Sequence, residues 1–410
     1  PPDALDAVLE HDEQRRAVLG ELEELRRQVN EISRQIGPAP DQETRQQLIA
    51  RSKEASAGIG PLEKQLATAE TALNELLLAI PNLPHESVPP GKDEHDNVEI
   101  RRVGNIPEFD FDPLGHVEIA EALGLFDTER AAKLSGSGFW LHRGLGAKLQ
   151  RVLINWMLDL HTSRHGYTEV YPPALIRSDA MTGTGHLPKF ANDSYHIESD
   201  DLWLAPTAEV PVTNIHRNEI LPLGSLPINY AAYTPCFRRE AGAAGTETRG
   251  LLRVHQFDKV ELVKFVEPAT SYDEQLKLLA NAEAVLQELE LPYRVIELCA
   301  GDLSGAAAKC FDIELWAAGT PGPSDTGPGR WLEISSISNF EDSQARRASI
   351  RYRPEKGARP RFAHTLNGSG VALPRLIVAL LENNQQPDGS VAIPKVLHAP
   401  LGTDRLQIPT

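Results

Sequence analysis

The 410-residue sequence predicts an α+β protein, in which an N-terminal antiparallel two-helix coiled-coil arm precedes a larger domain with a mixed, mainly antiparallel sheet flanked by helices. Two observations lead to this prediction. Residues 1–80 carry two heptad stripes of apolar side chains separated by a short turn, and residues 116–410 alternate strand-like and helical runs. These runs do not follow a strict strand–helix–strand order, which favours antiparallel strand pairing.

The first 80 residues are expected to form a helical hairpin. Apolar side chains recur at alternating steps of four and three residues over 18–36 and again over 55–76. Residues 37–40, Gly-Pro-Ala-Pro, interrupt the pattern, because proline lacks the backbone N–H that a helix needs. Each stripe buries the other when the two helices run antiparallel. The first helix, over residues 3–36, would be about 50 Å long, which exceeds the diameter of a small domain, so the arm is expected to project into solvent. Gly58 and Gly60 are expected to weaken the second helix locally, by about 1 kcal/mol each.

The charge of this arm is uneven. Residues 1–80 hold 9 basic and 15 acidic side chains, a net charge of −6, whereas the distal residues 25–53 hold 6 basic and 3 acidic ones, a net charge of +3. A basic tip suits contact with a phosphate backbone, and a solvated coiled-coil surface is the alternative interpretation. With 41 basic and 58 acidic residues the whole chain, at −17, is too acidic for a general nucleic-acid coat.

Residues 81–115 are predicted to be a linker, because prolines and charged residues dominate them. The large domain is predicted over residues 116–410. Its strands are expected at residues 167–171, 254–266, 293–298, 311–316, 331–336 and 350–352, and its helices at residues 147–161, 272–289 and 370–382.

The composition excludes several classes of protein. Cys236, Cys299 and Cys310 form no CxxC pair, which excludes a disulfide framework and a zinc ribbon and suits a reducing compartment. No apolar run reaches the ~18 residues of a membrane-spanning helix, and the first residues lack an apolar secretory segment. We therefore expect a cytoplasmic protein with no zinc and no membrane partner. The sequence also lacks the GxxxxGK[ST], GxGxxG, HExxH and GxSxG fingerprints.

Four polar clusters lie in otherwise apolar or strand-like surroundings. Their arginines offer a fixed fork of donors that fits phosphate or carboxylate, and Glu333 with Ser336 supplies the oxygen ligands that Mg²⁺ takes. Phe257 offers a face on which a base stacks. Taken singly, each cluster is better explained as surface ion pairs on a sheet edge, but together they favour a site for an anionic nucleotide and a metal. The clusters are residues 207–209, 237–261, 333–347 and 365–375.

In this order, the clusters resemble the motifs of seryl-tRNA synthetases, a family of class II aminoacyl-tRNA synthetases. Residues 166–175 resemble motif 1, whose proline lies at the dimer interface, and residues 207–211 resemble the serine loop of that family. Residues 237–261 resemble motif 2, residues 367–375 resemble motif 3, and the helical hairpin resembles the tRNA-binding arm. The resemblance covers nearly the whole chain, and it implies a homodimer with a class II synthetase catalytic domain over residues 116–410.

The resemblance also implies an activity. The expected enzyme activates L-serine with ATP and Mg²⁺ to seryl-adenylate and pyrophosphate. It then transfers the seryl group to the 3′ end of tRNA(Ser), with tRNA(Sec) as a second acceptor. No protein nucleophile is needed, because positioning and electrostatic stabilisation carry such chemistry. Contacts with tRNA are expected from Arg26, Arg27 and Arg34 of the arm.

By the same resemblance, Arg238 is expected to bridge the α-phosphate and the serine carboxylate, and Glu240 to read the adenine amino group. Phe257 is expected to stack under adenine, Arg375 to hold the γ-phosphate, and Glu261 to anchor the serine ammonium or hydroxyl group. The expected catalytic residues are Arg238, Arg375 and Glu261, and the expected Mg²⁺ ligands are Glu333 and Ser336. The expected ATP site comprises Arg238, Arg239, Glu240, Arg253, Phe257, Glu333, Ile334, Ser335, Ser336 and Arg375. The expected serine site comprises Thr207, Ala208, Glu209, Arg238, Glu261, Asn367 and Ser369.

Two alternatives fit parts of the sequence. A related protein that activates an amino acid for a carrier protein generally lacks the arm, which this chain keeps. A non-catalytic coiled-coil protein with a decayed enzyme domain would not need Arg238, Glu240, Glu261, Glu333 and Arg375 together.

Overall fold

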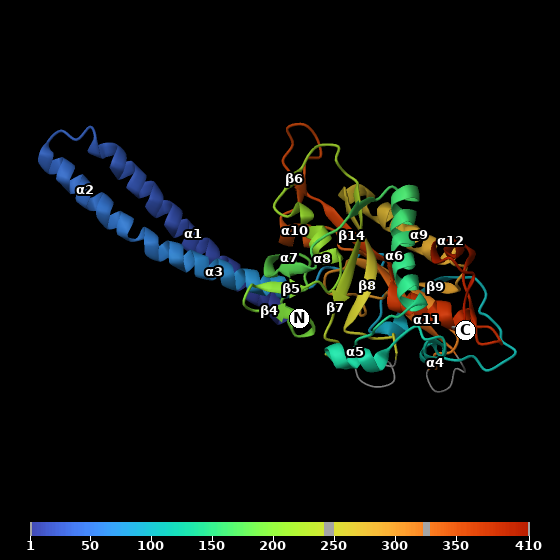
Figure 1. Ribbon diagram of the computed structural model, residues 1–410. Helices are drawn as coiled ribbons and strands as arrows, with labels where there is room; N and C mark the ends of the chain where they lie inside the picture. The colour runs from blue at the N-terminus through green and yellow to red at the C-terminus, as the bar shows by residue number, and fades with distance from the viewer. Residues whose placement is uncertain (1, 242–249, 323–328, 409–410) are drawn as a thin grey trace. The chain divides into compact units, whose positions relative to one another are not determined.

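The computed structural model describes residues 2–241, 250–322 and 329–408. The chain divides into two compact units, Pro1–Pro81 and Asn82–Thr410 (Figure 1). No helix in the described part of the chain combines the length and the apolar character that crossing a bilayer requires.

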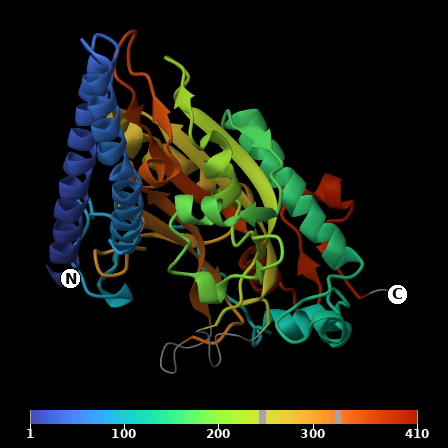
Figure 2. The same cartoon turned by 90° about the vertical axis from the view of Figure 1, so that its left-hand side faces the viewer.

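The first unit is an antiparallel helical hairpin, as the heptad spacing predicts. Helix α1 (Pro2–Ile36) forms one leg, and α2 (Gln42–Ala57) followed by α3 (Ile59–Ala79) forms the other; the legs lie side by side in Figures 1 and 2. The second leg is interrupted at Gly58, where an added Cβ would come within 2.9 Å of Leu25 Cδ2. Glycine therefore lets the two legs approach closely at the position that the sequence marks as weak.

The second unit is built around an eight-stranded sheet. Every neighbouring pair is antiparallel except β2 and β7, which confirms the predicted mixed, mainly antiparallel sheet. The strand order is β1 (Val98–Val103), β9 (Tyr293–Glu297), β10 (Lys309–Ala317), β11 (Arg330–Asn339), β14 (His364–Ala372), β8 (Gln256–Val266), β7 (Ile228–Phe237) and β2 (Thr168–Val170).

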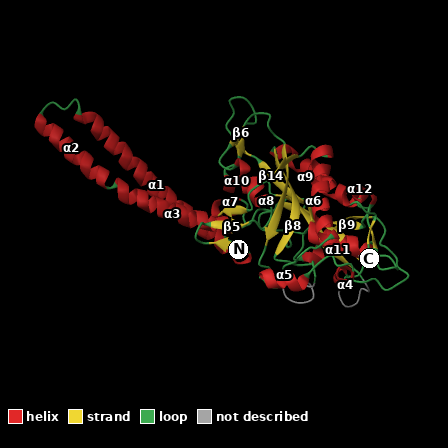
Figure 3. Cartoon of the chain, in the orientation of Figure 1, coloured by secondary structure: helices red, strands yellow, loops and turns green. Residues whose placement is uncertain are grey.

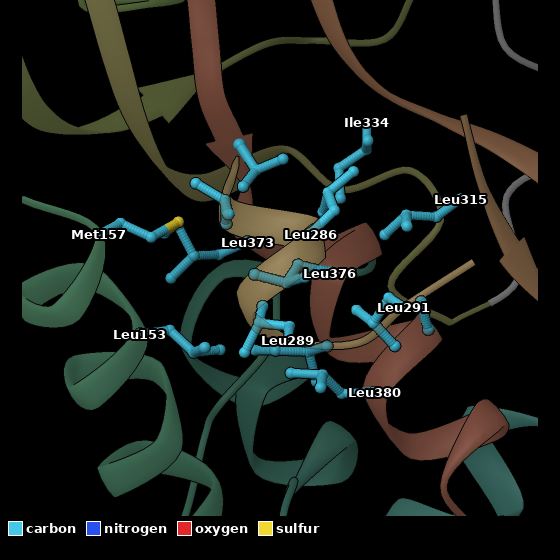
Figure 4. Packing of buried hydrophobic residues seen from close by; sticks show 14 of the residues in the cluster. Leu153, Met157, Leu286, Leu289, Leu291, Leu315, Ile334, Leu373, Leu376 and Leu380 are labelled. Carbon is cyan, nitrogen blue, oxygen red and sulfur yellow. The ribbon is translucent and has the colours of Figure 1, made fainter. Parts of the chain in front are cut away.

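Three helices cover one face of this sheet with apolar side chains. They are α6 (Leu145–Arg164), α9 (Ser271–Glu288) and α11 (Leu373–Asn383), which lie beside the strands in Figure 3. Figure 4 shows Met157 of α6 beside Leu373 of α11, with Leu286 of α9 toward Ile334 and Leu315 of the sheet. Because this face is filled by the core, polar side chains of the central strands are left to the opposite face.

Shorter elements surround the sheet. A second apolar cluster, formed by α8, α10 and the C-terminal half of β8, covers one end of the opposite face. The remaining elements are α4 (His116–Ala122), α5 (Thr128–Ser135), α7 (Ser178–Gly183), α8 (Glu209–Thr213), α10 (Ser343–Ala348), α12 (His398–Leu401), β3 (Leu175–Arg177), β4 (His196–Ile197), β5 (Leu202–Leu204), β6 (Ile220–Leu221), β12 (Arg351–Tyr352), β13 (Arg361–Phe362), β15 (Val391–Ala392) and β16 (Arg405–Leu406).

Strands β7 and β14 were not among the expected elements, and two expected elements differ in the structure. Residues 81–115, predicted as a linker, contain β1, which pairs with β9 at one edge of the sheet. The helix expected from residue 370 begins at Leu373, because Val371 and Ala372 still pair with Val260 and Lys259 of β8.

Candidate active site

Strand β8 carries the centre of the site. Val260 and Leu262 are fully buried in the core on one face of the sheet, so Phe257, Lys259 and Glu261 belong to the opposite face. Strands β7 and β14 flank β8, and the register sets Glu261 directly opposite residues of both strands. Polar side chains of three neighbouring strands therefore meet around Glu261.

Thr207 ties this strand to the segment that precedes α8. Its hydroxyl donates to Glu261 Oε2 at 2.8 Å and accepts from Lys259 Nζ at 2.9 Å and from the Glu209 N–H at 3.1 Å. Lys259 also forms an ion pair with Glu261. The exposed fractions of Thr207, Lys259 and Glu261 are 2%, 6% and 0%, so the group is closed to bulk water.

A second set of bonds joins the two carboxylates of the site. Asn367 Nδ2 donates to Glu209 Oε2 at 2.9 Å and to Glu261 Oε1 at 3.2 Å. Gln344 Nε2 donates to Glu209 Oε1 at 2.7 Å, and its own carbonyl accepts from Thr365 at 2.8 Å. Burial, followed by the charge of Glu261, raises the pKa of Glu209 to about 7.

This buried group has an uneven charge. It holds two carboxylates, Glu209 and Glu261, which share the amide of Asn367, and one ammonium, Lys259, which contacts Glu261. Buried carboxylates require a partner cation or a proton. The site is therefore suited to a ligand that brings its own ammonium group.

Arg238 follows β7 at the edge of this group. Its Nε donates to the Pro206 carbonyl at 3.3 Å, and its guanidinium lies 5.3 Å from the centre of the Phe257 ring. Within the described part of the chain, no carboxylate pairs with this guanidinium. The arginine is thus held in place by neutral groups and keeps its charge for an anionic ligand.

A cavity of about 910 Å³ opens across β9, β10 and β11, with Arg253, Glu333, Ser336 and Arg375 in its lining. Arg375 donates to the carbonyls of Leu252, at 3.3 Å, and Glu333, and its Nη1 lies 3.8 Å from Glu333 Oε2. The volume lies within the range of small-molecule sites. Its lining holds four arginines, Arg253, Arg294, Arg330 and Arg375, beside acidic and hydroxyl oxygens, which suits a polyanion bound with a cation.

The donor set in this cavity fits Mg²⁺. Ser336 Oγ donates to Glu333 Oε1 at 3.1 Å, so the two side chains lie together on β11. Among the described residues no group of three or more His, Cys, Asp or Glu forms a metal cluster. Two protein oxygens are nevertheless what Mg²⁺ commonly takes when substrate phosphates and waters supply its remaining ligands.

Comparisons with known proteins identify the family. Residues 1–84 match the seryl-tRNA synthetase N-terminal domain, and residues 194–384 match the tRNA synthetase class II core domain (G, H, P, S and T). A serine–tRNA ligase of Thermomicrobium roseum is 55% identical over 97% of this chain and 88% of its own length. The chain belongs to the seryl-tRNA synthetase family. It is accordingly an ATP-dependent ligase that joins serine to tRNA.

Solved structures of this synthetase family agree with that assignment. The seryl-tRNA synthetase of Pyrococcus horikoshii, solved with ATP, has a TM-score of 0.88 and 39% identity and covers 99% of this chain and 93% of its own. The cytoplasmic enzyme of Naegleria fowleri, solved with AMP, has a TM-score of 0.84 and 31% identity, covering 99% and 92%. The class II catalytic fold of this synthetase is therefore confirmed.

Several residues predicted for the serine and ATP sites do not direct their side chains toward the buried group around Glu261. Ala208 packs in the second apolar cluster, and Ile334 packs in the main core. The Ser335 hydroxyl donates to the Ser369 carbonyl at 2.6 Å. Arg239 donates to the Ser194 carbonyl at 3.1 Å and lies over Tyr195. Of the residues predicted to bind ATP, Arg238, Arg239, Glu240 and Phe257 do not line the cavity.

Glu240, the predicted adenine reader, adopts a left-handed backbone with φ of 51° and lies 3.6 Å from the Arg253 guanidinium. Residues 242–249, which belong to the predicted motif 2, are outside the described residues.

Lys259 and Gln344 contact the predicted serine residues but were not predicted from the sequence. Alternation along β8 offers a signal for Lys259, since Phe257, Lys259 and Glu261 are spaced by two residues. Gln344 has no such signal, because only the three-dimensional fold brings α10 to Glu209.

The arm arginines predicted to bind tRNA are on the surface of the first unit. Arg26 pairs with Glu63 at 2.7 Å, and Arg27 pairs with Glu24 and Glu31, each at 2.6 Å. About half of the Arg26 and Arg27 side chains is exposed. Exposed pairs of this kind exchange readily for other anions.

Proposed function

We propose that the buried group around Glu261 binds L-serine and that the cavity lined by Glu333, Ser336 and Arg375 takes part in binding ATP with Mg²⁺, so that this enzyme forms seryl-adenylate before it charges tRNA(Ser). The observation that carries the proposal is the buried pair of carboxylates, Glu209 and Glu261, with a single lysine in contact. An amino acid supplies the missing ammonium group, and the serine hydroxyl supplies a further hydrogen bond.

Serine recognition follows from the need to pair every buried polar group. A site built to hydrogen-bond a hydroxyl rejects an analogue without it, by up to ~10⁴–10⁵-fold, because the site's own groups are left unpaired. Glu261 Oε1 and the Ser369 hydroxyl are the groups that alanine would leave unsatisfied. This argument supports serine over alanine as the substrate.

The first reaction joins the serine carboxylate to the α-phosphorus of ATP and releases pyrophosphate. Arg238 is positioned to pair with both anions, which reduces their repulsion as the new P–O bond forms. Phe257 supports the adenine ring, Glu240 accepts from its amino group, and Arg375 holds the γ-phosphate. Glu333 and Ser336 hold Mg²⁺, whose charge offsets that of the phosphates when it is bound.

In the second reaction a ribose hydroxyl at the 3′ end of tRNA attacks the serine carbonyl carbon, and AMP leaves. Arg26, Arg27 and Arg34 are proposed to bind the tRNA backbone by exchanging their surface carboxylate partners for phosphates. tRNA(Sec) is proposed as a second acceptor.

The enzyme is also proposed to act as a homodimer in the cytoplasm. Residues 166–175, which resemble the dimer motif, carry Tyr171 and Leu175 with 79% and 44% of their surface exposed. Apolar side chains that remain exposed in one chain are expected to be covered by a partner.

Amino-acid-dependent exchange between ATP and labelled pyrophosphate tests the proposal. Each amino acid is supplied in turn to the full-length enzyme, and serine is expected to give the fastest exchange. Exchange with glycine or alanine but not with serine would exclude the proposed site. Charging of tRNA(Ser) and tRNA(Sec) is measured next, and transfer to a carrier protein in place of tRNA would exclude the proposed acceptor.

A further inference from the structure

We propose that Lys259 is a positioning residue for serine recognition, because its ammonium fixes both the carboxylate of Glu261 and the hydroxyl of Thr207 in the geometry that receives the substrate. This inference rests on the proposed serine site. Lys259 is not expected to touch the reacting atoms.

The place of Lys259 in the fold is the first support. It lies two residues after Phe257 and two residues before Glu261 on the same face of β8, between the proposed adenine and serine positions. Its side chain is 8% exposed, and its Nζ contacts Thr207 Oγ1 at 2.9 Å and the Glu261 carboxylate. A lysine this buried is retained only with partners, and both partners here belong to the proposed serine site.

The hydrogen bonds of the Thr207 hydroxyl are the second support. A hydroxyl has one proton to donate and two lone pairs to accept. Thr207 donates to Glu261 Oε2, and it accepts from Lys259 Nζ and from the Glu209 N–H. The protein therefore occupies every hydrogen-bonding position of the Thr207 hydroxyl, and the hydroxyl proton points to Glu261 Oε2 alone. Thr207 acts on serine by holding Glu261 in place. Lys259, by donating to the Thr207 hydroxyl, fixes the hydroxyl proton toward Glu261.

The hydrogen bonds that Glu261 accepts identify which of its two oxygens remains available to serine. Glu261 Oε2 already receives Thr207 and Lys259, whereas among the described residues Oε1 receives Asn367 alone. A carboxylate oxygen accepts about two hydrogen bonds. Oε1 thus keeps one position for the substrate, and it keeps it only while Oε2 is held by Lys259.

Charge is the third support. Without Lys259, Glu261 would have no ammonium in contact, and the pKa of Glu209, which the charge of Lys259 lowers, would rise further. The other titratable groups near Glu209 and Glu261 do not replace the positive charge of Lys259. Burial lowers the pKa of His186 to about 3 and raises that of Cys236, so both are neutral at pH 7. Arg238, the remaining cation, is committed to the substrate anions.

Exchange kinetics of Lys259→Met in the full-length enzyme test the inference. The KM for serine is expected to rise about 10- to 100-fold, the KM for ATP to change less than about twofold, and the melting temperature to report folding separately. Raising the pH from about 6.5 to about 8.5 is expected to lower the variant's KM for serine more steeply than that of the wild type, because the charge of Lys259 lowers the pKa of Glu209 and its loss keeps Glu209 protonated to a higher pH.

Matched variants separate this role from a structural one. Lys259→Arg restores a cation and is expected to recover part of the serine affinity, whereas Lys259→Gln keeps a donor without charge and serves if the methionine variant does not fold. Lys264→Met removes another buried lysine of β8, one that pairs with Glu274 on the opposite face. It is expected to lower the melting temperature while leaving the KM for serine unchanged.

The outcomes are distinct. A serine-specific rise in KM with a steeper pH profile and recovery by arginine supports the inference. An unchanged KM for serine, or an equal loss for ATP and serine that arginine does not recover, overturns it while leaving the proposed function intact. Absence of serine-dependent exchange in the wild type is a failure of the proposed function itself.

Discussion

The side-chain amide of Gln344 donates a 2.7 Å hydrogen bond to Oε1 of Glu209, which lies 135 residues earlier in the chain. Both groups are buried, and the Gln344 carbonyl is held in turn by Thr365. This bond lowers the pKa of Glu209 against the larger opposing effects of burial and of Glu261. Gln344 therefore helps to determine whether the carboxylate is ionised when serine arrives.

Replacing Gln344 by methionine is expected to weaken serine binding at neutral pH by about 1–3 kcal/mol. The variant leaves Glu209 Oε1 without its donor, so the carboxyl holds its proton to a higher pH. The KM for serine, measured by pyrophosphate exchange, should rise and then recover as the pH increases. A rise that is the same at every pH would mean that Gln344 acts through packing alone.

The wild-type enzyme is expected to bind serine better as the pH rises through about 7, the raised pKa of Glu209. The sign follows from the ligand, since an ammonium group pairs with the ionised carboxylate, which predominates above that pKa. The KM for serine should therefore fall from about pH 6 to about pH 8. Glu209→Gln cannot ionise, so its KM should be high and independent of pH; a flat wild-type profile would contradict the role of Glu209.

Arg238→Ala is expected to cost about 2–5 kcal/mol in kcat/KM for adenylate formation, because a desolvated charge loses its partner. Arg239→Ala is the matched comparison, since its guanidinium donates to the Ser194 carbonyl and lies over Tyr195. Its effect on exchange should be much smaller. Equal losses in the two variants would argue against a specific role for Arg238.

Glu333→Gln is expected to weaken Mn²⁺ binding in the presence of a non-hydrolysable ATP analogue by at least about tenfold. The free Mn²⁺ signal in electron paramagnetic resonance measures this binding without turnover. Glu314→Gln provides the comparison, because Glu314 lines the same cavity but pairs with Arg294. Similar Mn²⁺ affinity in the Glu333 variant and the wild type would exclude Glu333 as a ligand.

Removing the first unit, Pro1–Pro81, is expected to spare pyrophosphate exchange and to reduce tRNA charging strongly. In the full-length chain, the combined change of Arg26, Arg27 and Arg34 to alanine should raise the KM for tRNA and lower its salt dependence. The same change at Arg15 and Arg16, which pair with Asp12 in α1, is the control. Unchanged tRNA charging in both full-length variants would contradict the proposal that Arg26, Arg27 and Arg34 contact tRNA.

Local patterns in the sequence were sufficient for much of the fold. The heptad steps predicted the hairpin, since a repeat of this kind is readable within one helix. The start of α11 was misjudged because Gly370 and Val371 lie where strand pairing with β8, a contact over a hundred residues away, overrides local preference. Strand β7 was not predicted: it contains Pro235, which the sheet tolerates because β2 pairs only with residues 230–232.

The sequence also predicted only part of the candidate site. Glu261 and Asn367 were predicted from the family motifs, and the structure joins them through a 3.2 Å hydrogen bond. Lys259 and Gln344 were missed because their importance depends on which atoms they contact across the sheet. A motif gives the identity of a residue, but the number of hydrogen bonds each carboxylate oxygen accepts is determined only in three dimensions.

The two hydrogens of the Asn367 amide are both committed, and the next residue is Gly368. An asparagine followed by glycine is chemically the sequence most prone to deamidation in a mobile chain, because the glycine nitrogen attacks the amide easily. Here the pairing of Gly368 with Leu262 and Ile337 holds that nitrogen within the sheet. Conversion to aspartate would set a third carboxylate against Glu209 and Glu261. By holding the Gly368 nitrogen in place, the sheet therefore protects the site from a chemical change that would add a buried charge beside the two carboxylates.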